Sequence, residues 1–215
     1  MLHGIKINGV DTLEAYGLIL LSDLKIDEPE LKETYVDIPG ADGSLNLSYA
    51  LAGRPTYKNR DISFTLYKRV EDDALKLLRE QLMNAYHGRQ VTLQPPFETD
   101  AHYNGVIQFG ALSGYRSGKI PVTMSADPWK LKNSKTVVVS NISETGVITL
   151  QNWGKPVSLK ISTTAAITIT WGSNSVSLSA GADWLVPNLV LQADETSLAV
   201  TGTSTVTITY QEGSL

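Results

Sequence analysis

The sequence contains no cysteine, and this absence removes several kinds of chemistry at once. Disulfide bonds, thiolate zinc sites, iron–sulfur clusters and cysteine nucleophiles all require the thiol group. The redox compartment of the chain is left undetermined, because a protein without thiols folds alike in an oxidising or a reducing environment.

Excess positive charge and long apolar runs are also missing. The chain has 18 basic and 22 acidic residues, so its formal net charge is −4 and nucleic acid is not an expected partner. The longest apolar run near the start, residues 18–21, is far shorter than the ~20 residues that span a bilayer. The first ten residues lack a basic segment followed by an apolar one. We therefore expect no signal peptide, no membrane partner and synthesis in the cytoplasm.

The composition that is present indicates two globular domains. Of the 215 residues, 42% are hydrophobic and 19% are charged, which is sufficient for a sizeable core. Residues 1–132 hold 15 basic and 17 acidic residues, whereas residues 133–215 hold only three and five. A shift of this kind marks a domain boundary, which we place at residues 132–134.

The second domain, residues 133–215, reads as short alternating strands separated by Gly, Asn, Pro and Asp. Strands at roughly 8–12-residue spacing indicate an antiparallel β-sandwich. In the strand at 166–171, the alternation places Ile167, Ile169 and Trp171 on the inner face. Trp153 and Trp184 lie at turn-rich positions, where each either caps the core or is exposed enough to stack on a sugar or a protein.

The first domain, residues 1–132, has a mixed pattern. Seven strand candidates surround one convincing helix at about residues 72–87. Its apolar residues recur every three or four positions, acidic residues open it and Gly88 ends it; the apolar positions are Leu75, Leu78, Leu82, Ala85 and Tyr86. The fold class is therefore mainly β, with an α+β first domain.

Motifs for catalysis or metal binding are not found. Asp100 and His102 can share a face of an extended segment, but a metal site needs three or four ligands and only His87 is available as a third. We therefore expect no metal and no cofactor. A glycoside hydrolase would need paired carboxylates, and turn chemistry explains the one grouping in the second domain equally well. That grouping is Asp183 with Asp194 or Glu195.

One turn in the first domain has the composition of an exposed hairpin tip. Pro39-Gly40 and Asp42-Gly43 allow a positive φ at either glycine. The turn is either an ordinary hairpin or a loop that contacts another subunit. Residues alone leave both possibilities open.

The order of segments in the first domain resembles the distal tail proteins of long-tailed bacteriophages and prophages. The match runs in order and spacing over residues 1–132 and is looser beyond them. No single motif is diagnostic. The most specific pieces are Ile38–Gly43, Tyr57–Phe64 with Arg60, and Asp127–Trp129; Leu150–Pro156 and Tyr210–Leu215 match in the second domain.

The resemblance implies a structural protein of the virion and no enzyme. It implies a homo-hexameric ring, built from the first domains at the end of the tail tube, with a lectin-like or carbohydrate-module-like sandwich projecting outward. The expected partners are the tail-tube protein, the tail-tip hub protein and the receptor-binding protein of a baseplate. Family members often carry a basic residue before Asp-Gly where this chain has Ala41, so the contact made by that side chain is not carried over.

Carbohydrate binding by the second domain is the alternative function. Host wall polysaccharide would then be a partner, with Trp153 or Trp184 as the stacking platform. Because each tryptophan also has a simpler structural role, we expect sugar binding to be weak or absent.

Overall fold

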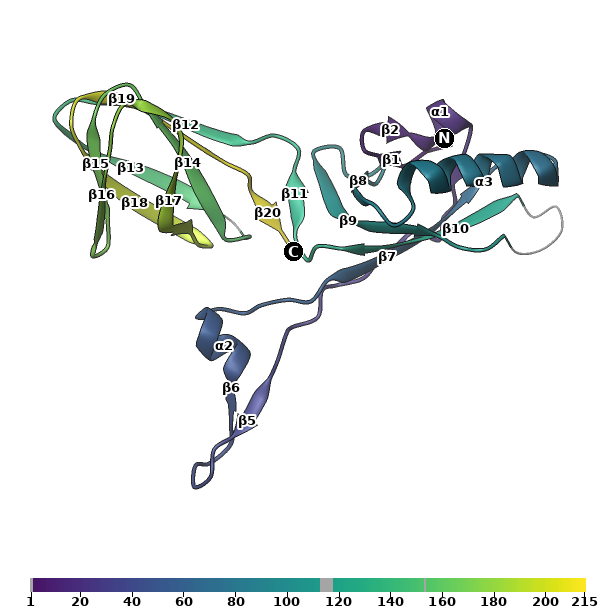
Figure 1. Ribbon diagram of the computed structural model, residues 1–215, viewed down its shortest axis with the longest axis horizontal. Coiled ribbons are helices and arrows are strands. Elements are labelled where there is room, and N and C mark those ends of the chain that lie inside the picture. The colour runs from purple at the N-terminus through teal and green to yellow at the C-terminus, as the bar shows by residue number, and fades with distance from the viewer. Residues whose placement is uncertain (1, 113–117, 153) are drawn as a thin grey trace. The chain divides into compact units, whose positions relative to one another are not determined.

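The computed structural model describes residues 2–112, 118–152 and 154–215, in two compact units, Met1–Lys130 and Leu131–Leu215 (Figure 1). The units meet two residues before the boundary expected from the charge pattern. Lys132 belongs with the second unit because its backbone N–H donates to Glu212 O at 3.0 Å and its carbonyl accepts from Gln211 Nε2 at 2.7 Å.

The first unit contains an antiparallel sheet in the strand order β2-β1-β8-β9-β10-β7-β3, and β4 also pairs with β7. The sequence predicts one strand segment over residues 18–26, but the structure has two short strands there. Asp23 separates them, because its Oδ1 accepts the backbone N–H of Thr65 at 3.1 Å. The bounds are β1 Lys6–Ile7, β2 Val10–Asp11, β3 Ile19–Leu20, β4 Lys25–Ile26, β7 Arg60–Tyr67, β8 Gln90–Gln94, β9 Ala101–Phe109 and β10 Lys119–Ala126.

Alternation along the central strands creates the core of the first unit. In β7, Ile62, Phe64 and Leu66 are buried and their neighbours are more exposed. Val122 of β10 lies opposite Phe64 in the register, so the buried faces of the two strands coincide. A period of two residues places every second side chain on one face, which is why this alternation predicts the buried face correctly.

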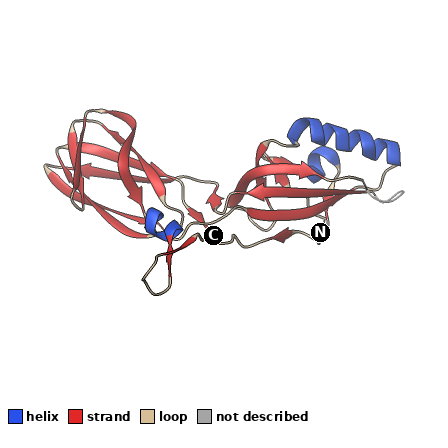
Figure 2. Cartoon of the chain, turned by 60° about the horizontal axis from the view of Figure 1, so that its bottom comes forward, coloured by secondary structure: helices blue, strands red, loops and turns tan. Residues whose placement is uncertain are grey.

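Helix α3, Asp72–Tyr86, packs on this sheet (Figure 2). It confirms the predicted helix, and Leu75, Leu82 and Tyr86 are buried as expected. Ala85, predicted to share that stripe, is exposed. The sequence does not predict the shorter helices α1 (Thr12–Tyr16) and α2 (Leu47–Ala52), which are too short to show a repeating apolar pattern.

The second unit contains two four-stranded antiparallel sheets, β12-β19-β14-β17 and β13-β18-β15-β16, around one apolar core (Figure 2). Ile167 and Ile169 are buried and Trp171 packs against the same core, as predicted. This confirms the mainly β fold class and the sandwich. The bounds are β12 Thr136–Ile142, β13 Thr145–Asn152, β14 Val157–Thr163, β15 Ile167–Trp171, β16 Asn174–Leu178, β17 Gly181–Leu191, β18 Asp194–Thr201 and β19 Ser204–Tyr210; β11, Lys130–Lys132, pairs with β20, Gly213–Ser214.

Candidate assembly surface

Residues 31–57 form an arm on the first unit (Figure 1). Strands β5 (Tyr35–Asp37) and β6 (Ser44–Asn46) pair only with each other in the described part of the chain, and α2 follows β6 directly. At the base of the arm, Leu31 pairs with Tyr57. An isolated two-stranded hairpin is marginally stable in water. The arm therefore lacks the sheet neighbours that stabilise the rest of the unit.

Local sequence chemistry shapes the tip of the arm. Ala41 N–H donates to Ile38 O at 3.1 Å, with Pro39 and Gly40 as the central residues and a φ of 80° at Gly40. This is a type II turn, which requires a positive φ at its third residue. Gly43 also has a positive φ, and Ser44 Oγ donates to Asp37 Oδ1 at 2.6 Å.

The predicted contact loop, Pro39, Gly40, Asp42 and Gly43, lies at this tip and is exposed. The structure thus places the loop where another molecule can reach it. Its role as a subunit contact stays a prediction.

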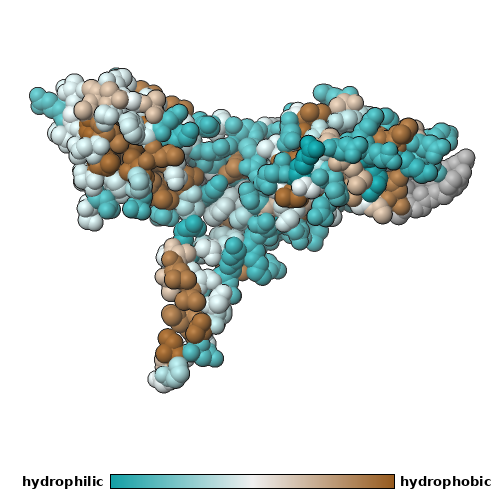
Figure 3. All heavy atoms as spheres, in the orientation of Figure 1, coloured by the Kyte–Doolittle hydropathy of each residue, from teal (hydrophilic) through white to brown (hydrophobic). Residues whose placement is uncertain are grey.

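The surface of the arm is unusually apolar (Figure 3). Single exposed apolar residues are normal on soluble proteins, but a contiguous group of them marks an interaction site. Leu51 is 81% exposed and the other members are 44–57% exposed. The group comprises Leu31, Tyr35, Val36, Ile38, Leu45, Tyr49 and Leu51.

The return strand of the arm is anchored where it enters the sheet. Arg60, only 4% exposed, donates from Nε to Pro128 O at 3.1 Å and again from Nη2, and its guanidinium lies 5.4 Å from the ring centroid of Tyr103. Tyr57 contacts Trp129 edge-on, with ring centroids 5.6 Å apart. Tyr57, Arg60 and the 127–129 segment, which carry the sequence resemblance, therefore meet in one place. Sequence order does not reveal this anchor.

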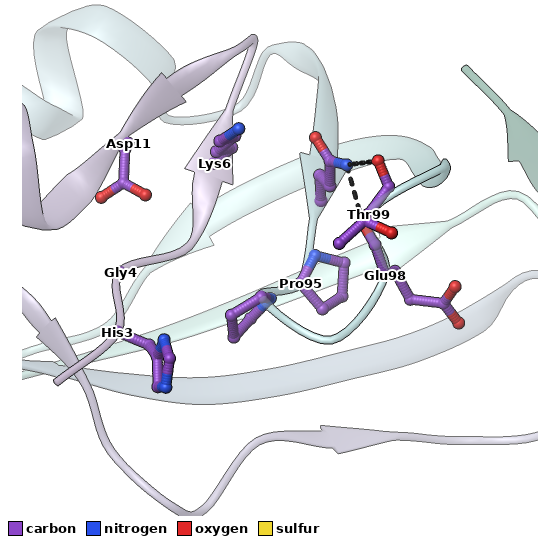
Figure 4. Close-up of a pocket in the computed structure, with 9 residues that line it drawn as sticks. His3, Gly4, Lys6, Asp11, Pro95, Glu98 and Thr99 are labelled. Carbon is purple, nitrogen blue, oxygen red and sulfur yellow. Dashed lines mark hydrogen bonds between the residues drawn. The ribbon is translucent and has the colours of Figure 1, made fainter. Parts of the chain in front are cut away.

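A polar pocket of about 250 Å³ lies near β1 and β8 (Figure 4). In the strand order of the sheet, these two strands are separated from β7, where the arm enters, by β9 and β10. Most of its polar groups have structural partners. Gln94 Nε2 donates to the carbonyls of Glu98 and Thr99 at 2.7 and 2.9 Å, and Glu98 is paired with Lys130 at 2.8 Å. Asp11 Oδ1 accepts the backbone N–H of Leu13 and thereby caps α1. The pocket shows no pairing of a nucleophile with a base.

The residues considered for metal binding do not form a ligand set. Among the described residues, no group of three His, Asp or Glu side chains lies close enough to hold a metal ion. His87 Nδ1 instead accepts the backbone N–H of Phe109 at 3.0 Å. No helix within the described ranges is long and apolar enough to cross a membrane.

Of the two tryptophans considered for sugar stacking, the structure describes only Trp184. Trp153 lies outside the described residues. Trp184 lies on β17 and is 40% exposed, so it is neither a fully buried core residue nor a free platform.

Two segments of the second unit carry the sequence resemblance, residues 150–156 and 210–215, and they contact each other. Tyr210 Oη donates to Gln151 O at 2.8 Å and Lys155 N–H donates to Gly213 O at 2.8 Å. A Cβ on Gly154 would lie 2.4 Å from Gly213 O, so the close approach requires glycine there. The carboxylate of Glu212 lies 2.6 Å from Lys132 Nζ and accepts the hydroxyl of Thr136.

This environment makes the stability of the second unit dependent on pH. Burial raises the pKa of Glu212, but the hydrogen bonds from Lys132 and Thr136, with the charge of Lys132, outweigh burial and hold the pKa below its ordinary value. A lowered folded pKa contributes stability that is present above the unfolded pKa, about 4.3, and is lost as the pH falls through the folded pKa.

We expect Glu212→Gln to lower the melting temperature at neutral pH. The difference from the native chain should shrink as the pH falls below about 4.3 and vanish below the folded pKa of Glu212. Thermal unfolding followed by circular dichroism between pH 7 and pH 3 measures this difference. Glu195→Gln is the matched control, because Glu195 is exposed and has no ion-pair partner among the described residues. A difference that persists unchanged at low pH would contradict the assignment.

The described residues thus form an α+β unit with an apolar arm and a β-sandwich unit. The crystal structure of the SPP1 Dit protein (gp 19.1) has the same fold, with a TM-score of 0.65, 16% sequence identity and 99% of each chain covered. That protein is described as a paradigm of the hub adsorption apparatus in phages that infect Gram-positive bacteria. The resemblance to distal tail proteins is thus confirmed in the fold. No protein-family model and no curated protein matches the sequence.

Proposed function

We propose that this chain is a structural component of a phage tail tip that assembles into a hexameric ring. The observation that carries the proposal is the likeness to the SPP1 Dit fold over 99% of both chains. Coverage of this extent includes both units, so the likeness is not confined to a common sandwich. The role is architectural and not enzymatic.

The arm supports assembly through the first unit. A ring is built from heterologous contacts, in which each copy presents two different complementary patches. The seven exposed apolar residues of the arm provide one such patch. Their burial against a neighbour would supply the stabilisation that the isolated hairpin lacks.

The ring would lie at the tail tip of the virion and join the tail tube to the tail-tip hub and the receptor-binding protein. The net charge of −4 is consistent with protein partners and gives no general attraction to nucleic acid. The binding of these three partners to the ring belongs to the same proposal.

A second candidate, binding of wall polysaccharide, is favoured by a cavity in the second unit. The cavity measures about 320 Å³ and is lined by Gln151, Asn152, Ala193, Asp194 and Glu195. Asn152 is 2% exposed, and its Oδ1 has no hydrogen-bond partner within the described ranges. Carboxylate and amide oxygens accept hydrogen bonds, and sugar hydroxyls donate them.

Solution mass tests the ring, and a binding titration tests the second candidate. Light scattering at high micromolar concentration should give about six times the 23.4 kDa chain mass, with rings in negative-stain images. A stable monomer under the same conditions would contradict the ring. Saturable binding of wall fragments, lost in Glu195→Ala at an unchanged melting temperature, would establish the sugar-binding role.

A further inference from the structure

The sequence contains two Asn-Gly pairs, and the structure places them in opposite environments. Asparagine loses its side-chain amide most readily before glycine, because glycine has no side chain to hinder attack by its own backbone nitrogen. Asn8-Gly9 is the turn between β1 and β2, whereas Asn104-Gly105 lies within β9. The two pairs therefore share their local chemistry and differ in how the fold holds them.

Asn8-Gly9 forms an exposed hairpin turn. Both residues have a positive φ, 51° at Asn8 and 81° at Gly9, as a two-residue type I′ turn requires. Both are exposed, and a Cβ built on Gly9 would meet no atom of the described residues within 4 Å. Water can therefore reach this turn, and its backbone has space to move.

Few contacts hold this turn closed. β1 and β2 pair through Lys6 with Asp11 and Ile7 with Val10, and β2 is the last strand on its side of the described sheet order. Asn8 N–H donates to Thr92 O at 2.8 Å, and Asn8 Oδ1 accepts the Thr92 N–H at 2.8 Å. Segments at a sheet edge open locally at a small fraction of the free energy of global unfolding. Such an opening releases Oδ1 and lets the amide carbon of Asn8 approach the Gly9 nitrogen.

Asn104-Gly105 is held from both sides. Gly105 lies opposite Val91 of β8 and Ala126 of β10, so two ladders must separate before its backbone can move. A Cβ built on Gly105 would clash with the carbonyl oxygen of Ser125, and Asn104 Oδ1 is itself buried. This pair therefore serves as a protected reference within the same chain.

We propose that Asn8 is a site of spontaneous deamidation that yields aspartate and isoaspartate. The Gly9 nitrogen gives its proton to a solvent base and attacks Asn8 Cγ. The new N–Cγ bond closes a succinimide ring, the Cγ–Nδ2 bond breaks, and the nitrogen leaves as ammonia with a proton from water. Water then opens the ring: cleavage of the N–Cγ bond gives aspartate, and cleavage of the bond from N to the main-chain carbonyl carbon gives isoaspartate. Water is the co-reactant in this sequence, and the ring of the proposed function is not required for it.

The two products have different consequences for the fold. Aspartate at position 8 retains an oxygen that accepts the Thr92 N–H, so the turn persists. Isoaspartate routes the main chain through its Cβ and adds one carbon to a two-residue turn. The register of Ile7 opposite Val10 is then lost, because a type I′ turn has no place for the extra backbone atom. Lys6, next to this turn, should become more accessible to trypsin.

Peptide mapping tests the site in the full chain. The protein is aged in mildly alkaline buffer, and a parallel sample is aged in guanidinium chloride. Trypsin places Asn8 and Asn104 in separate peptides, each with a single asparagine, so mass spectrometry follows both sites at once. A zero-time sample corrects for deamidation during digestion.

In native buffer, Asn8 should deamidate at least tenfold faster than Asn104, and in denaturant the two rates should become alike. Fragmentation by electron transfer should identify isoaspartate in the peptide that holds Asn8. Equal rates in native buffer, an unmodified Asn8, or aspartate as the only product would overturn the proposal.

Brief trypsin treatment of the aged, still folded chain gives a second measurement. Cleavage after Lys6 should rise at least tenfold in parallel with the isoaspartate content. Asn8→Asp is the matched control, because an ionised carboxylate is a poor electrophile and the variant should stay resistant over the same period. Resistance of the aged native chain despite measured isoaspartate would overturn the predicted loss of the turn.

Discussion

Removing the arm is expected to reduce the solution mass from six chains to one without unfolding the protein. The change joins Glu33 to Pro55 through a short Gly-Ser link and deletes residues 34–54. The deleted residues contribute nothing to the apolar core of the first unit. The base survives, because Lys32 N–H donates to Thr56 O at 2.8 Å and Lys58 N–H donates to Glu30 O at 2.7 Å.

The physical reason is that the deletion removes six of the seven exposed large hydrophobic residues of the arm. Light scattering measures the mass, and circular dichroism verifies that the melting temperature is unchanged. Val36→Ser with Leu45→Ser is a milder control, since these residues are cross-strand partners and their change leaves the backbone intact. A shortened chain that still forms hexamers would show that assembly uses another surface.

Arg60→Ala is expected to be the most damaging single substitution outside the apolar cores. It removes both Arg60 donors to Pro128 O and abolishes the contact with the face of Tyr103. Charge-assisted hydrogen bonds and a partly desolvated cation–π contact together amount to about 3 kcal/mol. For a unit of this size, that loss corresponds to a fall in melting temperature of roughly 10 °C.

Calorimetry measures this change, and two variants control for it. Arg60→Lys keeps the charge but not the planar pair of donors, so it should recover only part of the stability. Lys25→Ala breaks an exposed ion pair with Asp27 and should leave the melting temperature unchanged. An Arg60→Ala protein as stable as the native chain would mean that the anchor is dispensable.

Two side chains that line the polar pocket, and His87, which the sequence offers as a third metal ligand, have structural roles. His87 accepts a backbone N–H, Asp11 caps a helix and Glu98 is paired with Lys130. Each duty depends on a partner distant in the chain or on local helix geometry. The spacing of residues in the sequence reveals neither the distant partner nor the helix geometry. Motifs alone therefore identify candidate site residues but do not show which of them have structural roles.

The sequence by itself determined the fold class, the longer strands such as β7 and β15, and helix α3, because alternation and helical periodicity are local properties of the chain. It also located the hairpin tip at residues 38–43, since Pro-Gly and Asp-Gly specify turns through their own φ preferences. Short helices α1 and α2 escaped prediction, because five or six residues do not complete a repeating pattern.

Only the tertiary structure decided which residues meet. Arg60 reaches Pro128 across 68 positions, and Glu212 reaches Lys132 across 80, so neither contact follows from local pattern. The exposure of the arm is likewise a tertiary property: Val36 and Leu45 have the composition of a buried strand pair, and they are exposed because β5 and β6 have no further neighbour in the described sheet pairing. Burial depends on what the remainder of the chain, or another copy of it, places against a strand, and that information is not local to the strand.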